Sequence, residues 1–160
     1  MSDPDPLEIL DGRQSERAAE IQRGVCRFLR QMGHSVVTEL PLSSGHRADI
    51  VALGRTGELW ITEIKSSLAD FQSDGKWGEY RAHCDRLFFA VATDFPVDVL
   101  PQDTGLILAD RFGAEMMRDA PEHKLAGGRR KAVTLRFARF AALRLQTVID
   151  PGPAGFVPDP

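Results

Sequence analysis

The chain has 160 residues, of which 42% are hydrophobic and 27% are charged, and its formal net charge is −3. This length and composition fit one globular domain, and the acidic balance argues against a nonspecific nucleic-acid binder. Two distant cysteines are too few for a disulfide framework and no apolar run is long enough to span a membrane, so we expect a reduced cytoplasmic protein that is neither exported nor inserted.

The first half of the chain predicts a helix followed by three strands. Residues 1–12 are acidic and proline-bearing, which is typical of a flexible lead-in. A helix is expected from Ser15 to about Met32, because Ser15 can cap it and an apolar stripe follows. Residues 34–42 predict a first strand, and residues 47–53 and 58–67, joined by the polar turn 54–57, predict a β-hairpin.

The second half predicts two buried strands between helices. We expect a helix from about Lys76, a buried strand over residues 86–92, and a proline-punctuated connection with one helical turn over 94–104. Residues 105–110 predict another strand, with a short antiparallel partner ending at Arg118. A loop over 121–128 leads to a final helix over 129–149, which is apolar almost all round and is therefore expected to be substantially buried. Residues 150–160 are rich in proline and glycine and are expected to form a disordered tail.

This order of elements indicates an α/β sandwich, with a mixed β-sheet flanked by helices, formed by residues 13–149. The predicted hairpin carries three charges in apolar surroundings. Side chains alternate along a strand, so Glu63 and Lys65 share a face, and Asp49 comes from the neighbouring strand. An ordinary surface ion pair is the alternative, but burying such charges without a purpose would be costly. The pattern therefore favours a functional site.

The chemistry of these residues fits a divalent metal. Mg²⁺ prefers oxygen ligands, commonly one or two carboxylates with waters and phosphate oxygens. Asp49 and Glu63 supply the pair, the backbone carbonyl of Ile64 could add a third ligand, and Mn²⁺ is an equivalent occupant. Such a metal can activate a water for attack on a phosphodiester, and Lys65 is placed to position that water or to stabilise developing charge.

The same residues resemble the PD-(D/E)XK nuclease superfamily, in which Ala48 here takes the place of the nominal proline. The resemblance implies a restriction-endonuclease-like three-layer sandwich with an αβββαβ core. A longer string resembles the MmcB family of bacterial DNA-repair proteins over roughly residues 13–150. It comprises residues 45–49 and 63–67, Asp70-Phe71, Asp74, Lys76-Trp77, Tyr80, Cys84-Asp85, residues 105–107 and residues 112–115. This second resemblance implies a nuclease that acts on damaged or structured DNA in repair.

Further site residues follow from position in related folds. A third acidic ligand on the first strand or helix would be Glu39 or, less favoured, Glu20, which is better explained as part of a solvated helix face. Trp77 and Tyr80 could stack on unpaired bases, although aromatic residues at this helical spacing are more often part of the core. The other DNA-binding candidates are Arg47, Ser66, Lys76, Arg129, Arg130 and Lys131, of which the last three begin an acid-free basic helix and are expected to be little constrained by packing.

These features predict a Mg²⁺- or Mn²⁺-dependent deoxyribonuclease, an endonuclease in DNA repair, that is cytoplasmic and associated with the nucleoid. Its expected partners are DNA, other repair proteins and a second copy of the chain, since a homodimer suits cleavage of paired strands. The alternative is a DNA-binding or adaptor protein that keeps the fold without cleaving. A nucleotide phosphohydrolase is disfavoured because the chain has no glycine-rich phosphate loop.

Overall fold

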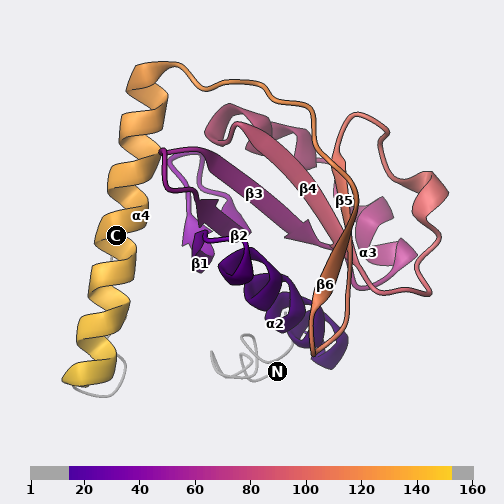
Figure 1. The fold of residues 1–160 in the computed structure, drawn as a ribbon, viewed down its shortest axis with the longest axis horizontal. Helices are drawn as coiled ribbons and strands as arrows, with labels where there is room; N and C mark the ends of the chain where they lie inside the picture. The colour runs from indigo at the N-terminus through magenta and orange to yellow at the C-terminus, as the bar shows by residue number, and fades with distance from the viewer. Residues whose placement is uncertain (1–14, 153–160) are drawn as a thin grey trace, which may run out of the picture.

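The structure is a computed structural model that describes residues 15–152. The predicted lead-in over residues 1–12 and most of the predicted tail, residues 153–160, lie outside this described part. The described chain forms one six-stranded mixed sheet whose strands follow chain order, β1-β2-β3-β4-β5-β6, with helices on both faces (Figure 1). The predicted three-layer α/β sandwich is confirmed.

The first helix and the first three strands agree closely with the sequence prediction. Helix α2 spans Glu16–Gln31, and the Ser15 hydroxyl caps it by accepting the Ala18 N–H at 3.1 Å. Strands β1 (Ser35–Pro41), β2 (Arg47–Leu53) and β3 (Leu59–Ile64) then form an antiparallel meander. The β2–β3 pair is the predicted hairpin.

The remaining strands complete the sheet with a change of direction. Strands β4 (Arg86–Val91) and β5 (Gly105–Ala109) run parallel to β3, and β6 (Ala114–Arg118) returns antiparallel at the edge. The apolar runs of β4 and β5 are buried because both faces of the central sheet are covered. A single 3₁₀ turn, η2 (Val97–Val99), lies in the predicted proline-punctuated connection between them.

The connection between β3 and β4 differs from the helix predicted from about Lys76. A short α-helix, α3 (Leu68–Ser73), comes first because the Ser67 hydroxyl accepts the Asp70 N–H and caps it. The segment expected to be α-helical is instead the 3₁₀ helix η1 (Trp77–His83). Gly78 within this segment disfavours a regular α-helix, because glycine loses the most backbone freedom on ordering.

The two faces of the sheet are covered by different helices. On one face, α2 packs Ile21, Val25 and Leu29 against strand residues that include Ile50 and Phe88. On the other face, η1 and the last helix, α4 (Gly127–Ile149), enclose a second apolar cluster. In α4 only Val133, Phe137 and Phe140 are buried.

The expectation that α4 is substantially buried is therefore wrong. Figure 1 shows the helix along one side of the molecule, and Leu135, Leu145 and Ile149 are 58%, 61% and 67% exposed. A helix that is apolar all round can be half-covered if only one side meets the sheet.

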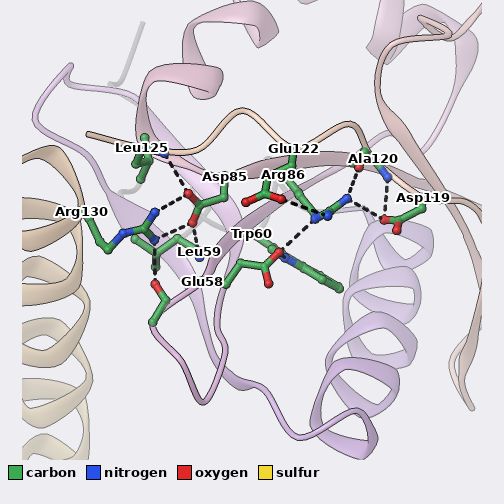
Figure 2. A network of polar contacts seen from close by, with 11 residues as sticks. Glu58, Leu59, Trp60, Asp85, Arg86, Asp119, Ala120, Glu122, Leu125 and Arg130 are labelled. Carbon is green, nitrogen blue, oxygen red and sulfur yellow. Dashed lines mark hydrogen bonds and ion pairs between the residues drawn. The ribbon is translucent and has the colours of Figure 1, made fainter. Parts of the chain in front are cut away.

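The start of α4 is tied to the sheet through Asp85, which is 1% exposed (Figure 2). Its carboxylate accepts the backbone N–H groups of Leu59 and Leu125 at 2.8 and 2.9 Å. It also accepts two hydrogen bonds from the Arg130 guanidinium, at 2.7 and 2.6 Å. Burial alone would raise the pKa of Asp85, but these bonds outweigh it and lower the pKa to about 2.

A second charged cluster lies beside the first in Figure 2. The Arg86 guanidinium donates to Glu58 at 3.0 Å and to the Ala120 carbonyl, and it lies 3.5 Å from both Asp119 and Glu122. The loop that leads to α4 is thereby held against the start of β4.

Within residues 15–152 no helix combines the length and the apolar character needed to cross a membrane.

Candidate functional site

The site is built where β2 and β3 separate. The two strands pair from Leu53 and Leu59 as far as Ile50 and Thr62, and beyond that point side chains replace the ladder. The Asp49 N–H donates to Glu63 Oε1 at 3.1 Å, and the Ile64 N–H donates to Asp49 Oδ2 at 2.8 Å. Each carboxylate therefore satisfies a backbone donor of the opposite strand, which holds both side chains in fixed positions.

The two carboxylates are poorly solvated. Glu63 is 4% exposed and Asp49 is half-buried. Burial, followed by repulsion from Asp49, raises the pKa of Glu63 well above its usual range. Burial also raises the pKa of Asp49, although the hydrogen bond from Ile64 opposes that shift. Neighbouring carboxyl groups with perturbed pKa values in a cleft are typical of functional sites.

Lys65 is also buried, at 5% exposure, so it does not belong to a surface ion pair. Its ammonium group donates to Asp74 Oδ2 at 2.6 Å. Burial tends to raise the pKa of Asp74, but the bond and charge of Lys65 together with backbone hydrogen bonds outweigh burial, and the pKa is lowered. The nearest countercharge of Lys65 is therefore Asp74 rather than the pair formed by Asp49 and Glu63.

A cavity of about 550 Å³ joins all of these groups. Five carboxylates and two cations line it: Glu39, Asp49, Glu63, Asp70 and Asp74 against Arg47 and Lys65. The first turns of α2 close one side with Ser15, Ala18 and Gln22. The lining thus carries an excess of negative formal charge, which disfavours anions and favours cations inside the cavity.

Three of these lining residues were assigned no role from the sequence. Asp70 accepts bonds from the Ser66 N–H and hydroxyl at 3.0 and 3.3 Å, and Asp74 Oδ1 accepts the Lys76 N–H at 2.9 Å. Gln22 reaches the cavity from α2. The only sequence signal for the two aspartates was their place in the resemblance to the MmcB family, because neither has a regular spacing to the hairpin.

Glu39 lines the same cavity from β1. It has a φ of +54°, the one positive φ of a non-glycine residue within residues 15–152. The pairs Thr38–Ile50 and Leu40–Ala48 put Glu39 level with Asp49. A residue without glycine's freedom is held in this conformation at a cost, which is common at functional sites.

The acidic groups nevertheless form a pair rather than a larger ligand cluster. Glu39 lies 3.8 Å from Arg47, and Glu20, the weaker alternative, is not among the cavity-lining residues. In the part of the chain that the structure describes, no three His, Cys, Asp or Glu side chains are grouped so as to hold a metal ion. Neither residue is thus shown to be a ligand.

The structure brings some of the predicted DNA-binding residues to the cavity. Arg47 is exposed and Ser66 is half-buried at its lining, whereas Lys76 is exposed beyond it. Tyr80 is buried and donates its hydroxyl to the Arg47 carbonyl at 2.9 Å. The Trp77 ring packs on Phe89 at 5.5 Å. Both aromatic rings therefore contribute to packing, and stacking on bases stays a prediction.

The basic residues at the start of α4 differ in their environments. Arg129 and Lys131 are exposed, as expected of residues that could meet phosphate. The premise that Arg130 is little constrained by packing is wrong, because its guanidinium binds Asp85 and donates to the Gly57 carbonyl at 2.8 Å. Arg130 fixes α4 to the sheet.

The fold and site define a class: a three-layer α/β protein with a buried acidic pair and a lysine at the point where two strands part. The chain belongs to the DNA repair protein MmcB-like family, which it matches over residues 5–152. A solved structure of SPO1766, a protein of unknown function from Silicibacter pomeroyi, is similar at 46% identity. That match has a TM-score of 0.84 and covers 90% of this chain and 99% of the other. No curated protein matches the chain.

Proposed function

We propose that the cavity is the active site of a metal-dependent DNA-repair endonuclease of the PD-(D/E)XK type. The observation that carries the proposal is the pair of Asp49 and Glu63, held by reciprocal bonds to the backbone of the opposite strand. The family to which the chain belongs supports DNA repair as the setting and DNA as the substrate.

The charge balance of the cavity supports a bound cation. The pKa of Glu63 is raised because burial and the neighbouring Asp49 are offset only in part by the Asp49 N–H and the charge of Lys65. The ammonium group of Lys65 is itself bonded to Asp74. A divalent ion between Asp49 and Glu63 would provide the missing countercharge.

The donor set fits Mg²⁺ or Mn²⁺. The Ile64 N–H donates to Asp49, and the N–H and C=O of a strand residue point to the same side, so the Ile64 carbonyl faces β2 as well. Two carboxylates and a carbonyl suit Mg²⁺, which keeps several waters and commonly binds through one or two carboxylates plus substrate phosphate. When bound, the ion would acidify a water and neutralise charge on the phosphate.

The chain's own residues have separate roles in this proposal. Asp49 and Glu63 bind the ion, and Lys65 stabilises negative charge that develops on the phosphate, with its ammonium oriented by Asp74. Arg47 at the cavity and the exposed Arg129 and Lys131 would contact the DNA backbone.

The test is a nuclease screen of single-stranded, flap, fork, D-loop and duplex DNA with Mg²⁺ or Mn²⁺. Glu63→Gln keeps the oxygen that accepts the Asp49 N–H but loses the charge, so it should fold normally and lower the cleavage rate about 100-fold or more. Lys65→Ala should have a similar effect. Glu115→Gln removes an exposed carboxylate on β6 and should leave the rate unchanged. Full activity of Glu63→Gln or Lys65→Ala would refute the mechanism.

A DNA-binding adaptor that does not cleave is the second candidate. Two observations favour it: the described residues form no cluster of three metal-binding side chains, and the charge of Lys65 is already matched by Asp74. Calorimetric titration with Mn²⁺ in the presence of DNA separates the two functions. The nuclease requires binding that is lost in Asp49→Asn, and the adaptor does not.

A further inference from the structure

The outward side of α4 carries an apolar stripe that none of residues 15–152 covers. Its members follow one another at intervals of three, four, three and four residues: Leu135, Ala138, Ala142, Leu145 and Ile149. All five are exposed, and they lie opposite the buried Val133, Phe137 and Phe140. This alternation is the a/d pattern of a helix that pairs with another helix along a 3.5-residue repeat.

The stripe is too regular and too exposed for an ordinary solvated helix face. Leu145 is 61% exposed and Ile149 is 67% exposed, and their neighbours on the stripe are also apolar. Single exposed apolar residues need no explanation, but a continuous row marks an interaction surface. The buried side of α4 packs on η1 and the sheet, and the helix lies along one side of the molecule (Figure 1), so among residues 15–152 the row has no partner on its outward side.

We propose that this surface pairs with the α4 helix of a second copy of the chain, antiparallel and about a twofold axis. The intervals from Leu135 to Leu145 are three, four and three, which read the same in both directions. Antiparallel pairing therefore sets Leu135 against Leu145 and Ala138 against Ala142 in both halves of the contact. A twofold interface requires this kind of self-complementary surface.

The sizes of the side chains suit such a pair. The two alanines occupy the middle of the stripe, where small residues let helix axes approach to about 8 Å, the short end of the usual range. The leucines lie at either side, where they fill the space that opens as the helices diverge. A partner of a different kind would not require the large and small positions to be arranged symmetrically.

The flanking charges favour the antiparallel direction. In the same register Lys131, in the first turns of one helix, lies opposite Ile149 of the other, where its ammonium group can reach the adjacent Asp150. Lysine near a helix C-terminus also interacts favourably with the helix dipole. Arg139 borders the middle of the stripe and meets its own counterpart near the axis, which opposes the pairing. One helix pair buries a small area, so the dimer is expected to dissociate in the micromolar range.

The association is measured by sedimentation velocity of the full chain from about 1 to 200 µM, a range that spans the expected dissociation constant. Leu145→Lys should weaken dimerisation at least about tenfold, because each dimer then buries two ammonium groups. Lysine is a good helix former and suits the last turns of α4, so the variant should keep its fold. Met117→Lys changes an exposed apolar residue on β6 and should leave dimerisation unchanged.

The direction of pairing has its own test. Lys131→Glu alone and Asp150→Lys alone should each weaken the dimer about two- to fivefold, and the double swap should restore it. Arg139→Gln should tighten it by a similar factor. A chain that stays monomeric throughout the concentration range overturns the proposal. A dimer that is unaffected by Leu145→Lys also overturns it, and failure of the double swap rules out the antiparallel register. None of these results depends on nuclease activity.

Discussion

The bond network at Asp85 makes a quantitative prediction about stability. Asp85 accepts four hydrogen bonds while 1% exposed, and its pKa falls from 3.8 to about 2. A lowering of about two units corresponds to roughly 2.5 kcal/mol of stability from ionisation of this one group. Asp85→Asn removes the charge and leaves Arg130 without its partner. We expect it to lower the free energy of unfolding by about 3 kcal/mol at neutral pH, within the range for breaking a buried ion pair.

The pH dependence has a defined sign. A carboxyl group with a lowered folded-state pKa stabilises the protein above its unfolded pKa, and the contribution is lost as the pH falls toward the folded pKa. The difference between wild type and Asp85→Asn should therefore be constant near neutrality. It should shrink by roughly 2 kcal/mol between about pH 5 and pH 2.

Urea unfolding at a series of pH values measures both the loss of unfolding free energy in Asp85→Asn at neutral pH and the change of that loss with pH. Asp119→Asn is the matched control, because it removes a carboxylate from the neighbouring network whose side chain is 65% exposed, and its effect should be below about 0.5 kcal/mol. A difference between wild type and Asp85→Asn that stays the same from neutral to acidic pH would refute the reasoning, since it would mean that the ionised carboxylate is not selectively stabilised.

Three further predictions concern packing and reactivity. In α2, a Cβ on Gly24 would lie 1.9 Å from the Asp110 carbonyl oxygen, so Gly24→Ala should cost about 2 kcal/mol or more in thermal unfolding. Gly128→Ala, with nothing nearby, should be neutral or stabilising; equal melting temperatures for the two variants would contradict this account. Burial raises the pKa of Cys84 to about 12, so its thiol should resist labelling at pH 8 until the protein unfolds, and rapid labelling of folded protein would count against that burial. Tyr80→Phe leaves a β2 carbonyl without its hydroxyl donor and should lower stability by about 1 kcal/mol, measured as a shift in the urea midpoint; no shift would mean that water replaces the hydroxyl.

The position of the acidic pair has a structural cause. The next hydrogen-bonded pair of the β2–β3 ladder would use the Ile64 N–H, and the strands part before reaching it. The carboxylates of Glu63 and Asp49 take over as acceptors. The cavity lies where the strands separate, so the carboxylates of Asp49 and Glu63 that accept these backbone N–H groups also line the cavity.

Several elements could be predicted because their signals are local. Helix α2 has a serine cap and a regular apolar stripe, and the hairpin of β2 and β3 has apolar strands around a short polar turn. Hairpin pairing follows from the length of the turn, so the amino-acid sequence is enough to place Asp49 and Glu63 together. The start of the helix after Ser67 was missed, although its capping serine is a local signal.

The sequence by itself determined the succession of helices and strands along the chain, most element boundaries and the pairing of Asp49 with Glu63, because these depend on periodicity and on short connections. Only the tertiary structure decided that Lys65 binds Asp74, that Arg130 binds Asp85, and which side of α4 faces outward. Each of these depends on how segments approach one another after the chain has folded. Contacts between segments that are distant in the sequence cannot be predicted from the local spacing of residues along the chain.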